Sequence, residues 1–336
     1  MKVLILRFSS IGDIVLTTPV VRTLKTQVEG IEIHYATKLQ YKELFEANPY
    51  VDRMHYLGES LADLVTELKK EKFDCVIDLH HNLRTFRIKQ KLGIRSYSFD
   101  KLNVQKWLKV NMKIDRLPNV HIVDRYMDTV KALGVKMDAL GLDFFIPEKD
   151  EVPLDWLPEA FRDNYVVYAI GAQHATKKLP VARMIELCDK INKPIVLLGN
   201  KEDAEVAGQV ERFFERPLGN ELSEQSLQKL LNKKTIIFNA CGKFNINQSA
   251  SLVKKARYVF THDTALMHIA AAFRKEVYCI WGNTIPAFGM YPYRTKFTVF
   301  ENNRLDCRPC SKIGFGTCPK GHFKCMNDLI LDFYLG

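Results

Sequence analysis

The sequence predicts an α/β protein with two domains, each built on a doubly wound parallel sheet. Short apolar runs alternate with helical patterns along the chain, an order that favours parallel strands covered by helices on both faces. The 336 residues suit two domains of ordinary size better than one core. A segment with three prolines and mixed charge, residues 147–164, divides the pattern. We therefore expect one domain over residues 1–152 and a second over residues 153–336.

Eight apolar runs have the length and composition of buried strands. They are residues 3–8, 31–36, 74–79, 165–170, 194–198, 235–239, 257–261 and 277–281. Helical patterns between them include residues 60–71, 181–191, 202–214, 224–232 and 264–273. Two such domains facing each other place the carboxyl ends of their strands around a crevice, where ligands of open α/β sheets bind.

Composition and charge narrow the class of protein. The apolar and charged fractions, 47% and 26%, are typical of a soluble globular protein. No signal peptide is recognisable, and no stretch approaches the roughly 18 apolar residues of a membrane span. Together with eight scattered cysteines, this favours a cytoplasmic protein with reduced thiols.

The net charge of +10 is concentrated between Arg84 and Arg116, where ten basic residues face two acidic ones. Within this segment, Lys106 and Lys109 flank Trp107 and Leu108. That combination suits an anionic membrane surface or a phosphorylated amphiphile. The other interpretation is an ordinary solvated basic face.

The first strand-to-helix loop lies in RFSSIGDIVLTTPVVR, residues 7–22. We expect the strand to end near Phe8 and the helix to begin near Asp13. Small residues at such a junction often cradle phosphate, yet Asp13 puts a negative charge where an anion would bind. The residues alone leave Asp13 as either a helix cap or a catalytic group.

The second domain opens with a comparable loop, VVYAIGAQHATKKLP, residues 166–180. Small residues after the strand lead to Thr176, Lys177 and Lys178, whose side chains can bind phosphate oxygens. The spacing of a Walker loop is absent, and a plain surface loop is an equal alternative.

A stronger phosphate signal is FTHDTALMHIAAAF, residues 260–273. A strand ends there and a helix begins at Asp263 or Thr264, with Asp263 a good N-cap. The amides at Thr264 and Ala265 would then carry the partial positive charge that favours phosphate. His268 lies one turn further along, on the same helix face as Thr264.

In order and spacing, these segments resemble glycosyltransferase family 9, the ADP-heptose:lipopolysaccharide heptosyltransferases of Gram-negative bacteria. The similar blocks are KVLILRFSSIGDIVLTTPVVRTLK, NPYVDRMHYL, FDCVIDLHHNLRT, IGAQHATKKLP, LLGNKEDAEVA, NACGKFNINQSASLVKKARYVFTHDTALMHIAAAF and WGNT. The sequence departs from the family pattern at Ala265, where glycine is usual, at Asn283, where proline is usual, and at Leu179, where an aromatic is common.

The resemblance implies a GT-B fold, with the acceptor on the first domain, the donor on the second and the last helix, residues 328–335, returning to the first. It implies inverting transfer of heptose from ADP-heptose to a lipopolysaccharide core acceptor of the lipid A–Kdo type, without a cofactor, at the cytoplasmic face of the inner membrane. The implied catalytic base is Asp13. The implied donor-binding residues are Thr176, Lys177, Glu202 or Asp203, Asp263, Thr264, Ala265, Met267 and His268. The implied acceptor-binding residues are Gly12, which leaves room for the acceptor hydroxyl, and His80, Asn82 and Arg84, with His81 beside them.

Other functions stay open at this stage. A GT-B enzyme could use another nucleotide-sugar donor, and a sugar-nucleotide epimerase has a related design. A basic nucleic-acid-binding protein is the weakest alternative, because the sequence lacks the motifs of such modules.

Four of the eight cysteines gather near the C-terminus, at Cys307, Cys310, Cys318 and Cys325, with His322 nearby. The first pair has the spacing of a zinc half-site, but the second pair is spaced irregularly. Structural zinc, reduced thiols and a disulfide are the three interpretations. In each of them we expect the cluster to lie away from the chemistry.

Overall fold

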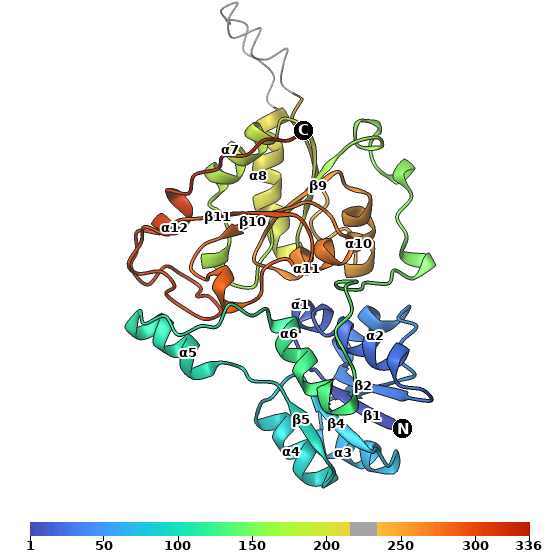
Figure 1. Ribbon diagram of the computed structural model, residues 1–336. Helices are drawn as coiled ribbons and strands as arrows, with labels where there is room; N and C mark the ends of the chain where they lie inside the picture. The colour runs from blue at the N-terminus through green and yellow to red at the C-terminus, as the bar shows by residue number, and fades with distance from the viewer. Residues whose placement is uncertain (216–233) are drawn as a thin grey trace, which may run out of the picture.

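The computed structural model describes residues 1–215 and 234–336, which form two domains, each on its own parallel sheet (Figure 1). The first sheet has the strand order β3-β2-β1-β4-β5, and the second has the order β11-β10-β9-β6-β7-β8. The strands are β1 Lys2–Leu6, β2 Glu32–Lys38, β3 Arg53–Leu57, β4 Cys75–Asp78, β5 Ser96–Ser98, β6 Val166–Ala169, β7 Pro194–Leu198, β8 Ile236–Asn239, β9 Tyr258–His262, β10 Val277–Trp281 and β11 Phe297–Glu301. The predicted α/β class with two doubly wound parallel sheets is confirmed.

Alternation along the central strands explains why both faces of each sheet are covered. In β1, Val3 and Ile5 belong to one buried cluster, whereas Leu4 and Leu6 belong to the cluster on the opposite face. Successive side chains of a strand point to opposite faces, so a run of four apolar residues supplies two cores. This is why the runs without polar residues were recognisable as central strands.

Three strands are not predicted from the sequence, and each of them is an edge strand of its sheet. β3 is RMHYL and β11 is FTVFE, both of which mix polar and exposed residues into the apolar pattern. β5 has only three residues, of which two are exposed. Strands near an edge bury less surface, so their sequences carry a weaker signal.

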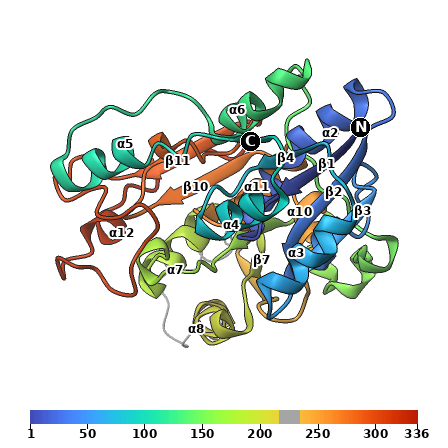
Figure 2. The ribbon, with the colours of Figure 1, turned by 90° about the horizontal axis from the view of Figure 1, so that it is seen from below.

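Helices cover the sheets on both sides (Figures 1 and 2). Their bounds are α1 Ile11–Val15, α2 Thr18–Gln27, α3 Leu61–Lys70, α4 Leu83–Leu92, α5 Asn103–Trp107, α6 Ile122–Met127, α7 Val181–Ile191, α8 Ala204–Glu215, α10 Ile246–Lys255, α11 Ala265–Ala272 and α12 Lys324–Asn327. Shorter turns of 3-10 or π type include η1 Leu39–Phe45, η2 Leu108–Met112, η3 Asp128–Leu133 and η8 Lys201–Asp203. The helix expected over residues 224–232 lies outside the described residues. Within the described ranges, no helix combines the length and hydropathy that crossing a bilayer requires.

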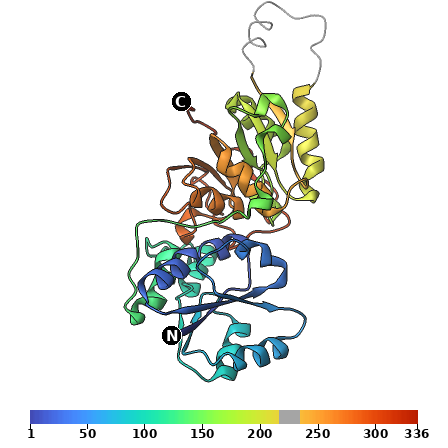
Figure 3. The ribbon, with the colours of Figure 1, turned by 90° about the vertical axis from the view of Figure 1, so that its right-hand side faces the viewer.

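The expected last helix over residues 328–335 is wrong. Beyond α12 the chain runs extended along the second domain and does not return to the first (Figure 3). Arg183 donates to the carbonyl of Leu329, and Lys190 Nζ donates to the carbonyl of Leu331 at 2.9 Å. Leu329 and Leu331 are buried in the core of the second domain. The alternation of apolar residues in this segment therefore reflects an extended chain against a core and not a helix.

The two domains meet at α1 and α11, which lie opposite each other at the junction (Figures 1 and 3). One apolar cluster passes through the junction, since Val15 of α1 and Ile269 of α11 both belong to it. Polar contacts add to it at the rim, where Asn247 of α10 donates to the carbonyl of Glu43 at 3.2 Å. Both α1 and α11 begin directly after a strand, so their first turns lie at the carboxyl ends of the two sheets.

Candidate active site at the domain junction

Asp13 lies in the first turn of α1, and one of its carboxylate oxygens is tied to the start of that helix. The helix begins at Ile11, two residues before Asp13, with Ser10 as its N-cap residue. Asp13 Oδ2 accepts hydrogen bonds from the Ser10 backbone amide at 3.1 Å and from the Ser10 hydroxyl at 2.9 Å. Helix capping is therefore part of what Asp13 does.

The other oxygen is held by Arg7, a residue that the sequence analysis missed. Arg7 Nη2 lies 2.7 Å from Asp13 Oδ1, and the guanidinium is buried. Its remaining groups are fixed by the carbonyl of Leu79 at 2.5 Å, the hydroxyl of Tyr126 at 2.9 Å and the carbonyl of Ser9 at 2.7 Å. A charged residue directly after the buried run of β1 was the available signal, because a buried arginine requires a partner.

These contacts leave the Asp13 carboxylate ionised and directed. Burial of the carboxyl group favours its neutral form, but the Arg7 guanidinium and the Ser10 hydrogen bonds outweigh that and hold the pKa of Asp13 below its ordinary value. A carboxylate offers about four lone-pair positions, and three are used here. The side chain is 19% exposed, so part of it remains accessible.

Gly12 brings the two domains into contact. A Cβ atom at this position would lie 2.8 Å from Cδ2 of His268 and 3.3 Å from Cα of Ala265, both on α11. The expectation that Gly12 leaves room for an acceptor hydroxyl is therefore wrong, because α11 fills that space. Glycine is needed for the close approach of two helices, and this approach places Asp13 next to the second domain.

His268 lies in this contact as a buried, neutral imidazole. It is 2% exposed, and burial, the dominant effect, lowers its pKa to about 4. Its Nδ1 is buried without a hydrogen-bond partner among the described residues. At neutral pH this imidazole can donate a hydrogen bond to a ligand, but it adds no positive charge.

The second loop brings a lysine to the start of α11. Lys177 Nζ lies 2.5 Å from Asp263 Oδ2, and the same oxygen accepts a hydrogen bond from the Thr284 hydroxyl at 3.0 Å. The N-cap of α11 is Thr264, so the assignment of Asp263 as the cap is wrong. Because Asp263 precedes the cap, its carboxylate is free to pair with Lys177. Thr264 and Ala265 are half-buried at the beginning of the helix, as expected for a ligand-facing end.

A second residue missed from the sequence, His262, fixes this loop. Its Nε2 accepts a hydrogen bond from the backbone amide of Leu179 at 3.0 Å, and its Nδ1 lies 3.0 Å from the carbonyl of Ile170. The ring is fully buried, and burial lowers its pKa to about 4, so it is neutral. One imidazole thus ties both ends of the loop that carries Lys177.

The Thr176 hydroxyl is not available for a phosphate in this structure. It donates to the carbonyl of Phe315 at 3.1 Å and accepts from the Phe315 amide at 2.8 Å. The residue is 2% exposed. Thr176 therefore holds the cysteine-bearing segment against the lysine loop. Phe315 of this segment therefore lies beside the loop that carries Lys177, whereas the expectation that the cysteines themselves lie away from the chemistry stays a prediction.

The structure separates Glu202 from Asp203, which the sequence left as alternatives. Asp203 is 4% exposed, and its oxygens are used by Lys178 Nζ at 2.6 Å and by the backbone amide of Asn200 at 2.9 Å. Glu202 is exposed next to it, with no hydrogen-bond partner given among the described residues. Asp203 is accordingly a structural residue, and Glu202 is the carboxylate free for a ligand.

Met267 does not line a pocket. It is 0% exposed and packs in the core of the second domain with Val259 and Trp281. The expectation of contact with the donor is corrected to a core role, which its apolar helix position suits equally.

The expected acceptor residues follow β4 as predicted, but their side chains are already engaged to different degrees. Asn82 caps α4, with its side-chain oxygen accepting from the Thr85 amide at 3.0 Å. The ring of His80 lies 5.9 Å from that of Phe8, and burial followed by the charge of Arg7 lowers its pKa to about 4. The guanidinium of Arg84 lies 5.8 Å from the centroid of the same Phe8 ring.

Arg84 and Asn82 open onto a shallow hollow of about 510 Å³. Its other lining residues are Leu57, Gly58, Glu59, Leu61, Leu83 and Arg87. Two arginines at a hollow beside the carboxyl end of the sheet suit an anionic group. His81 is turned away, because its Nδ1 lies 2.8 Å from the carbonyl of Phe99.

Basic side chains from distant segments converge on the same side of the junction. Burial and then the charges of Arg125 and Lys312 lower the pKa of Lys106 to about 8. Burial and then the charges of Arg7 and Lys312 also lower the pKa of Lys101, whereas the charge of Asp13 opposes both shifts. Lys312 comes from the cysteine-bearing segment and donates to Asn103, 209 residues away, at 3.3 Å. Lys106 is thus half-buried near the crevice and does not lie on a solvated face.

The four clustered cysteines do not form a ligand sphere. Burial and then neighbouring thiols raise the pKa of both Cys310 and Cys325 to about 11, so the thiols are close enough to interact. However, in the described ranges the set of three metal-binding groups with all ligand atoms within 4.8 Å consists of His34, His55 and Glu71. None of the described cysteines is in a disulfide, and structural zinc stays a prediction, with Cys307 Sγ 3.8 Å from His322 Nε2.

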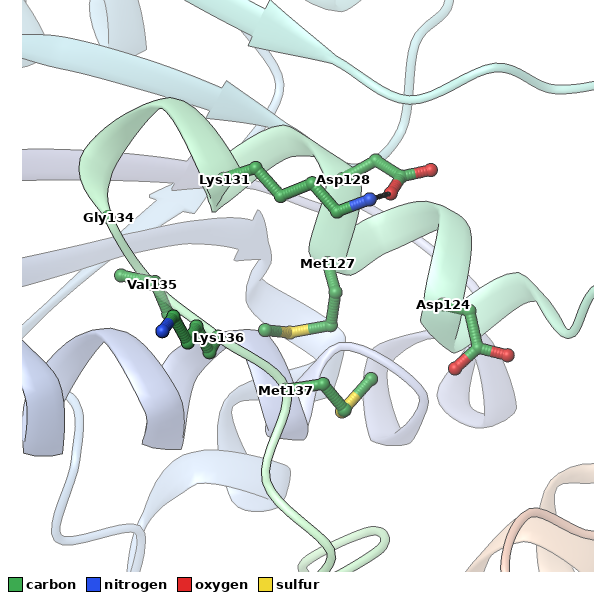
Figure 4. A pocket seen from close by; sticks show the side chains of 8 residues that line it. All are labelled: Asp124, Met127, Asp128, Lys131, Gly134, Val135, Lys136 and Met137. Atoms are coloured by element: carbon green, nitrogen blue, oxygen red, sulfur yellow. Dashed lines mark ion pairs between the residues drawn. The ribbon is translucent and has the colours of Figure 1, made fainter.

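A hollow outside the junction carries none of the predicted residues. It has a volume of about 530 Å³, lies along α6 and η3, and is lined by Met127, Val135 and Met137 with the Lys131–Asp128 ion pair at its rim (Figure 4). Its other lining residues are Asp124, Gly134 and Lys136, and because the charged groups predicted for the reaction meet at the junction, the candidate site remains there.

Comparisons with known proteins agree with this architecture. The family model of glycosyltransferase family 9 (heptosyltransferase) matches residues 61–317. Lipopolysaccharide heptosyltransferase 1 of Campylobacter coli is 22% identical over 91% of this chain and 89% of its own length. The structure of E. coli ADP-heptose lps heptosyltransferase II superposes with a TM-score of 0.67, 17% identity and 98% of each chain covered. The structure of E. coli heptosyltransferase WaaC with ADP superposes with a TM-score of 0.64 and 19% identity. This superposition covers 89% of this chain and 93% of that chain.

The expected GT-B fold is confirmed by these superpositions. Because the family model covers more than half of the sequence, membership does not depend on any single motif. The chain belongs to glycosyltransferase family 9 and is a glycosyltransferase.

Proposed function

We propose that this protein is an inverting heptosyltransferase that moves heptose from ADP-heptose to an acceptor of the lipopolysaccharide core type. The observation that carries the proposal is an ionised, oriented carboxylate on α1 next to the helix start and the Lys177–Asp263 pair of the other domain. The relatives support the donor, since one is described as an ADP-heptose enzyme and another was solved with ADP.

Asp13 is the base in this mechanism. The acceptor hydroxyl attacks the anomeric carbon from the face opposite the diphosphate, the carbon–oxygen bond to the diphosphate breaks, and the hydroxyl proton passes to Asp13. A carboxylate with a lowered pKa cannot deprotonate a free alcohol. Transfer therefore occurs late, when bonding to the anomeric carbon has made the hydroxyl acidic. Arg7 keeps the carboxylate ionised and pointed until that moment.

The leaving ADP takes the bonding electron pair and needs positive charge. Lys177 supplies one full charge, and the amides at Thr264 and Ala265 supply the partial charge of a helix start. Asp263 and Thr284 position the lysine. The neutral His268 donates a hydrogen bond to the same diphosphate.

Substrate recognition is divided between the domains. Glu202 binds ribose hydroxyls of the donor, because it is exposed and has no hydrogen-bond partner among the described residues, whereas Asp203 is buried and paired. On the first domain, Arg84 with the convergent Lys101 and Lys106 binds anionic groups of the acceptor. Phosphate or carboxylate groups on that acceptor suit this excess of positive charge.

The test is the Asp13→Asn variant, which keeps the size of the side chain and removes its basicity. We expect turnover to fall by about 10²- to 10⁴-fold while the affinity for ADP-heptose, measured by calorimetry, stays within about twofold. Asp63→Asn on the exposed side of α3 is the control for a lost surface charge. Near-normal turnover by Asp13→Asn would remove Asp13 as the base.

A donor screen tests the remaining specificity. ADP-heptose, other ADP-sugars, UDP-sugars and GDP-sugars are offered with and without a delipidated core acceptor, and nucleotide release is followed. We expect release from ADP-heptose only when the acceptor is present. Transfer from UDP-sugars alone would refute the donor, and donor conversion without acceptor would indicate an epimerase.

We further propose that α5 and η2 contact the anionic cytoplasmic face of the inner membrane, where such an acceptor would be anchored. Val104, Trp107, Met112 and Ile114 are between 41% and 68% exposed on this arm, amid the basic excess of residues 84–116. Trp107→Ala with Met112→Ala should weaken binding to vesicles containing anionic lipid and leave turnover of a soluble acceptor unchanged. Trp156→Ala with Leu140→Ala, which removes two exposed apolar side chains outside this arm, is the matched control. Unchanged vesicle binding by the double variant would refute the contact.

A further inference from the structure

Two histidines that take no part in the proposed reaction lie side by side on the first sheet. His34 is the third residue of β2, and His55 of β3 pairs with Ala36, two residues further along. Both side chains are 0% exposed, and both rings contact the edge or face of Phe73. His34 lies near the amino end of its strand, whereas Asp13 follows the carboxyl end of β1. The histidine pair therefore lies toward the opposite end of the parallel strands from Asp13.

The two imidazoles face each other, and a carboxylate accepts from the far side of each. His34 Nδ1 lies 2.7 Å from His55 Nε2. On the outer sides, His34 Nε2 lies 2.7 Å from Glu32 Oε1, and His55 Nδ1 is in contact with Glu67 Oε1. The side chains of Glu32 and Glu67 are 47% and 46% exposed, so both carboxyl groups reach the surface while contacting the buried rings.

When both imidazoles are neutral, this row of hydrogen bonds lacks one positive charge between the two rings. Each outer contact with a carboxylate needs an N–H, so two neutral imidazoles spend both of their protons outward. Their inner nitrogens, His34 Nδ1 and His55 Nε2, then carry lone pairs that point at each other. Two lone pairs at 2.7 Å repel unless a cation lies between them.

Glu71 supplies a third ligand at the same point. Its Oε2 lies 4.0 Å from His34 Nδ1, and its carboxylate is also held by Lys2 and Arg53. The ligand atoms of His34, His55 and Glu71 all lie within 4.8 Å of one another. With neutral imidazoles, the three glutamates outweigh Lys2 and Arg53 by one negative charge, which favours an added cation.

We propose that His34, His55 and Glu71 bind a divalent metal ion of the zinc class. Nδ1 of His34, Nε2 of His55 and a carboxylate oxygen of Glu71 are the ligands, and water completes the sphere. Glu32 and Glu67 accept the outer N–H groups and fix the tautomers, the arrangement that orients metal-binding histidines in proteins. Zinc–nitrogen bonds of about 2.0–2.1 Å need the two nitrogens about 3.3 Å apart, so the rings separate slightly on binding.

The site joins β2, β3 and the end of α3, because Glu71 is the residue directly after that helix. A metal there would hold a strand near the sheet edge and its covering helix together. It touches no residue of the proposed reaction. We therefore expect it to raise thermal stability without changing turnover at moderate temperature.

The experiment is zinc titration of the chelator-treated full-length protein by calorimetry at pH 7.5, followed by thermal unfolding with and without zinc. Glu71→Gln keeps hydrogen bonding to Lys2 and Arg53 but removes a ligand, and should weaken zinc binding by about 100-fold. Glu67→Gln removes only the charge behind His55 and should weaken it by about 10- to 100-fold. Glu59→Gln, exposed before α3, is the matched control and should bind as the unmodified protein does.

Cobalt distinguishes this site from the cysteines, since thiolate ligands add a charge-transfer band in the near ultraviolet. We expect cobalt bound without that band, and unchanged binding in the Cys307→Ser, Cys310→Ser double variant. Zinc binding that survives His55→Gln and Glu71→Gln would overturn the proposal. Absence of zinc binding to the unmodified protein would overturn it as well, and a shared proton would then be the cation between the rings.

Discussion

Replacing Arg7 by glutamine should move the pH dependence of turnover, because Arg7 sets the ionisation of Asp13. The Arg7 Nη2 to Asp13 Oδ1 distance is 2.7 Å, which puts the charge centres about 4 Å apart. At an effective dielectric constant near 20, such a pair interacts by about 4 kcal/mol, equal to nearly a thousandfold in proton affinity. Without the guanidinium, burial raises the pKa of Asp13. The acidic limb of the kcat profile should then rise by roughly two to three pH units.

Stability gives a second measurement with a definite sign. In the unmodified protein the lowered pKa of Asp13 stabilises the fold above the ordinary carboxyl pKa, and this contribution is lost as the pH falls. In Arg7→Gln the carboxylate is buried and unpaired, which costs about 3–5 kcal/mol at neutral pH and is relieved as the pH falls. Adding Asp13→Asn to Arg7→Gln should therefore restore stability.

The assay is the rate of ADP release with saturating donor and acceptor between pH 4 and pH 9, alongside urea unfolding at pH 5 and pH 7. Arg7→Lys retains the charge and should keep the acidic limb near its original position, with a lower rate because the contacts to Leu79 and Tyr126 are lost. If Arg7→Gln is folded and its acidic limb does not move, Arg7 does not control the base, and the reasoning fails.

Other predictions follow from the same geometry. Gly12→Ala should cost about 1–3 kcal/mol in urea unfolding and lower kcat, because its methyl group would press on His268 across the junction; adding His268→Ala should recover part of the stability. The acceptor KM should rise above pH 8 as Lys106 loses its proton, and Lys106→Arg should remove that rise; a pH-independent KM in the unmodified protein would contradict it. Glu202→Gln should raise the donor KM without lowering the melting temperature, whereas Asp203→Asn should lower the melting temperature. Equal effects of the two variants on stability would refute the separation of their roles.

Much of the fold follows from the sequence because the central strands bury both faces. The runs beginning at Val3, Val166 and Val277 have no polar interruption, and each became a central or near-central strand. The sequence pattern does not predict strands that are only partly buried, such as β5. It also does not predict the conformation of an apolar segment that packs against a core distant in sequence. The chain after Asn327 is extended because Leu329 and Leu331 fill the second core, a fact that no local pattern contains.

The sequence predicts the main charged groups of the candidate site but not which side chains they contact. Asp13 and Lys177 were recognisable from loops of small residues after strands. His262 and Lys312 were not, because each acts through a partner far away in sequence, and Arg7 was missed although its partner Asp13 follows six residues later. Their partners are set by the meeting of segments at the junction, such as Lys312 with Asn103, 209 residues apart.

Capping patterns explain which polar residues of these loops remain free for chemistry. Asp203 and Asn82 each stand at a helix start with side-chain oxygens bound within the structure, and Asp203 is only 4% exposed, so its remaining lone pairs are shielded from a ligand. Asp263 escapes because Thr264 takes the cap, and its carboxylate reaches Lys177 in another loop. Asp13 lies between these two cases. Its Oδ2 accepts hydrogen bonds at the start of its own helix, whereas its Oδ1 is held by Arg7 and keeps one lone pair. A carboxylate in such a loop is therefore a candidate for catalysis only where it stays exposed once its helix start is capped, and in this protein the side-chain exposure, 19% for Asp13 against 6% for Asp203, separates the two.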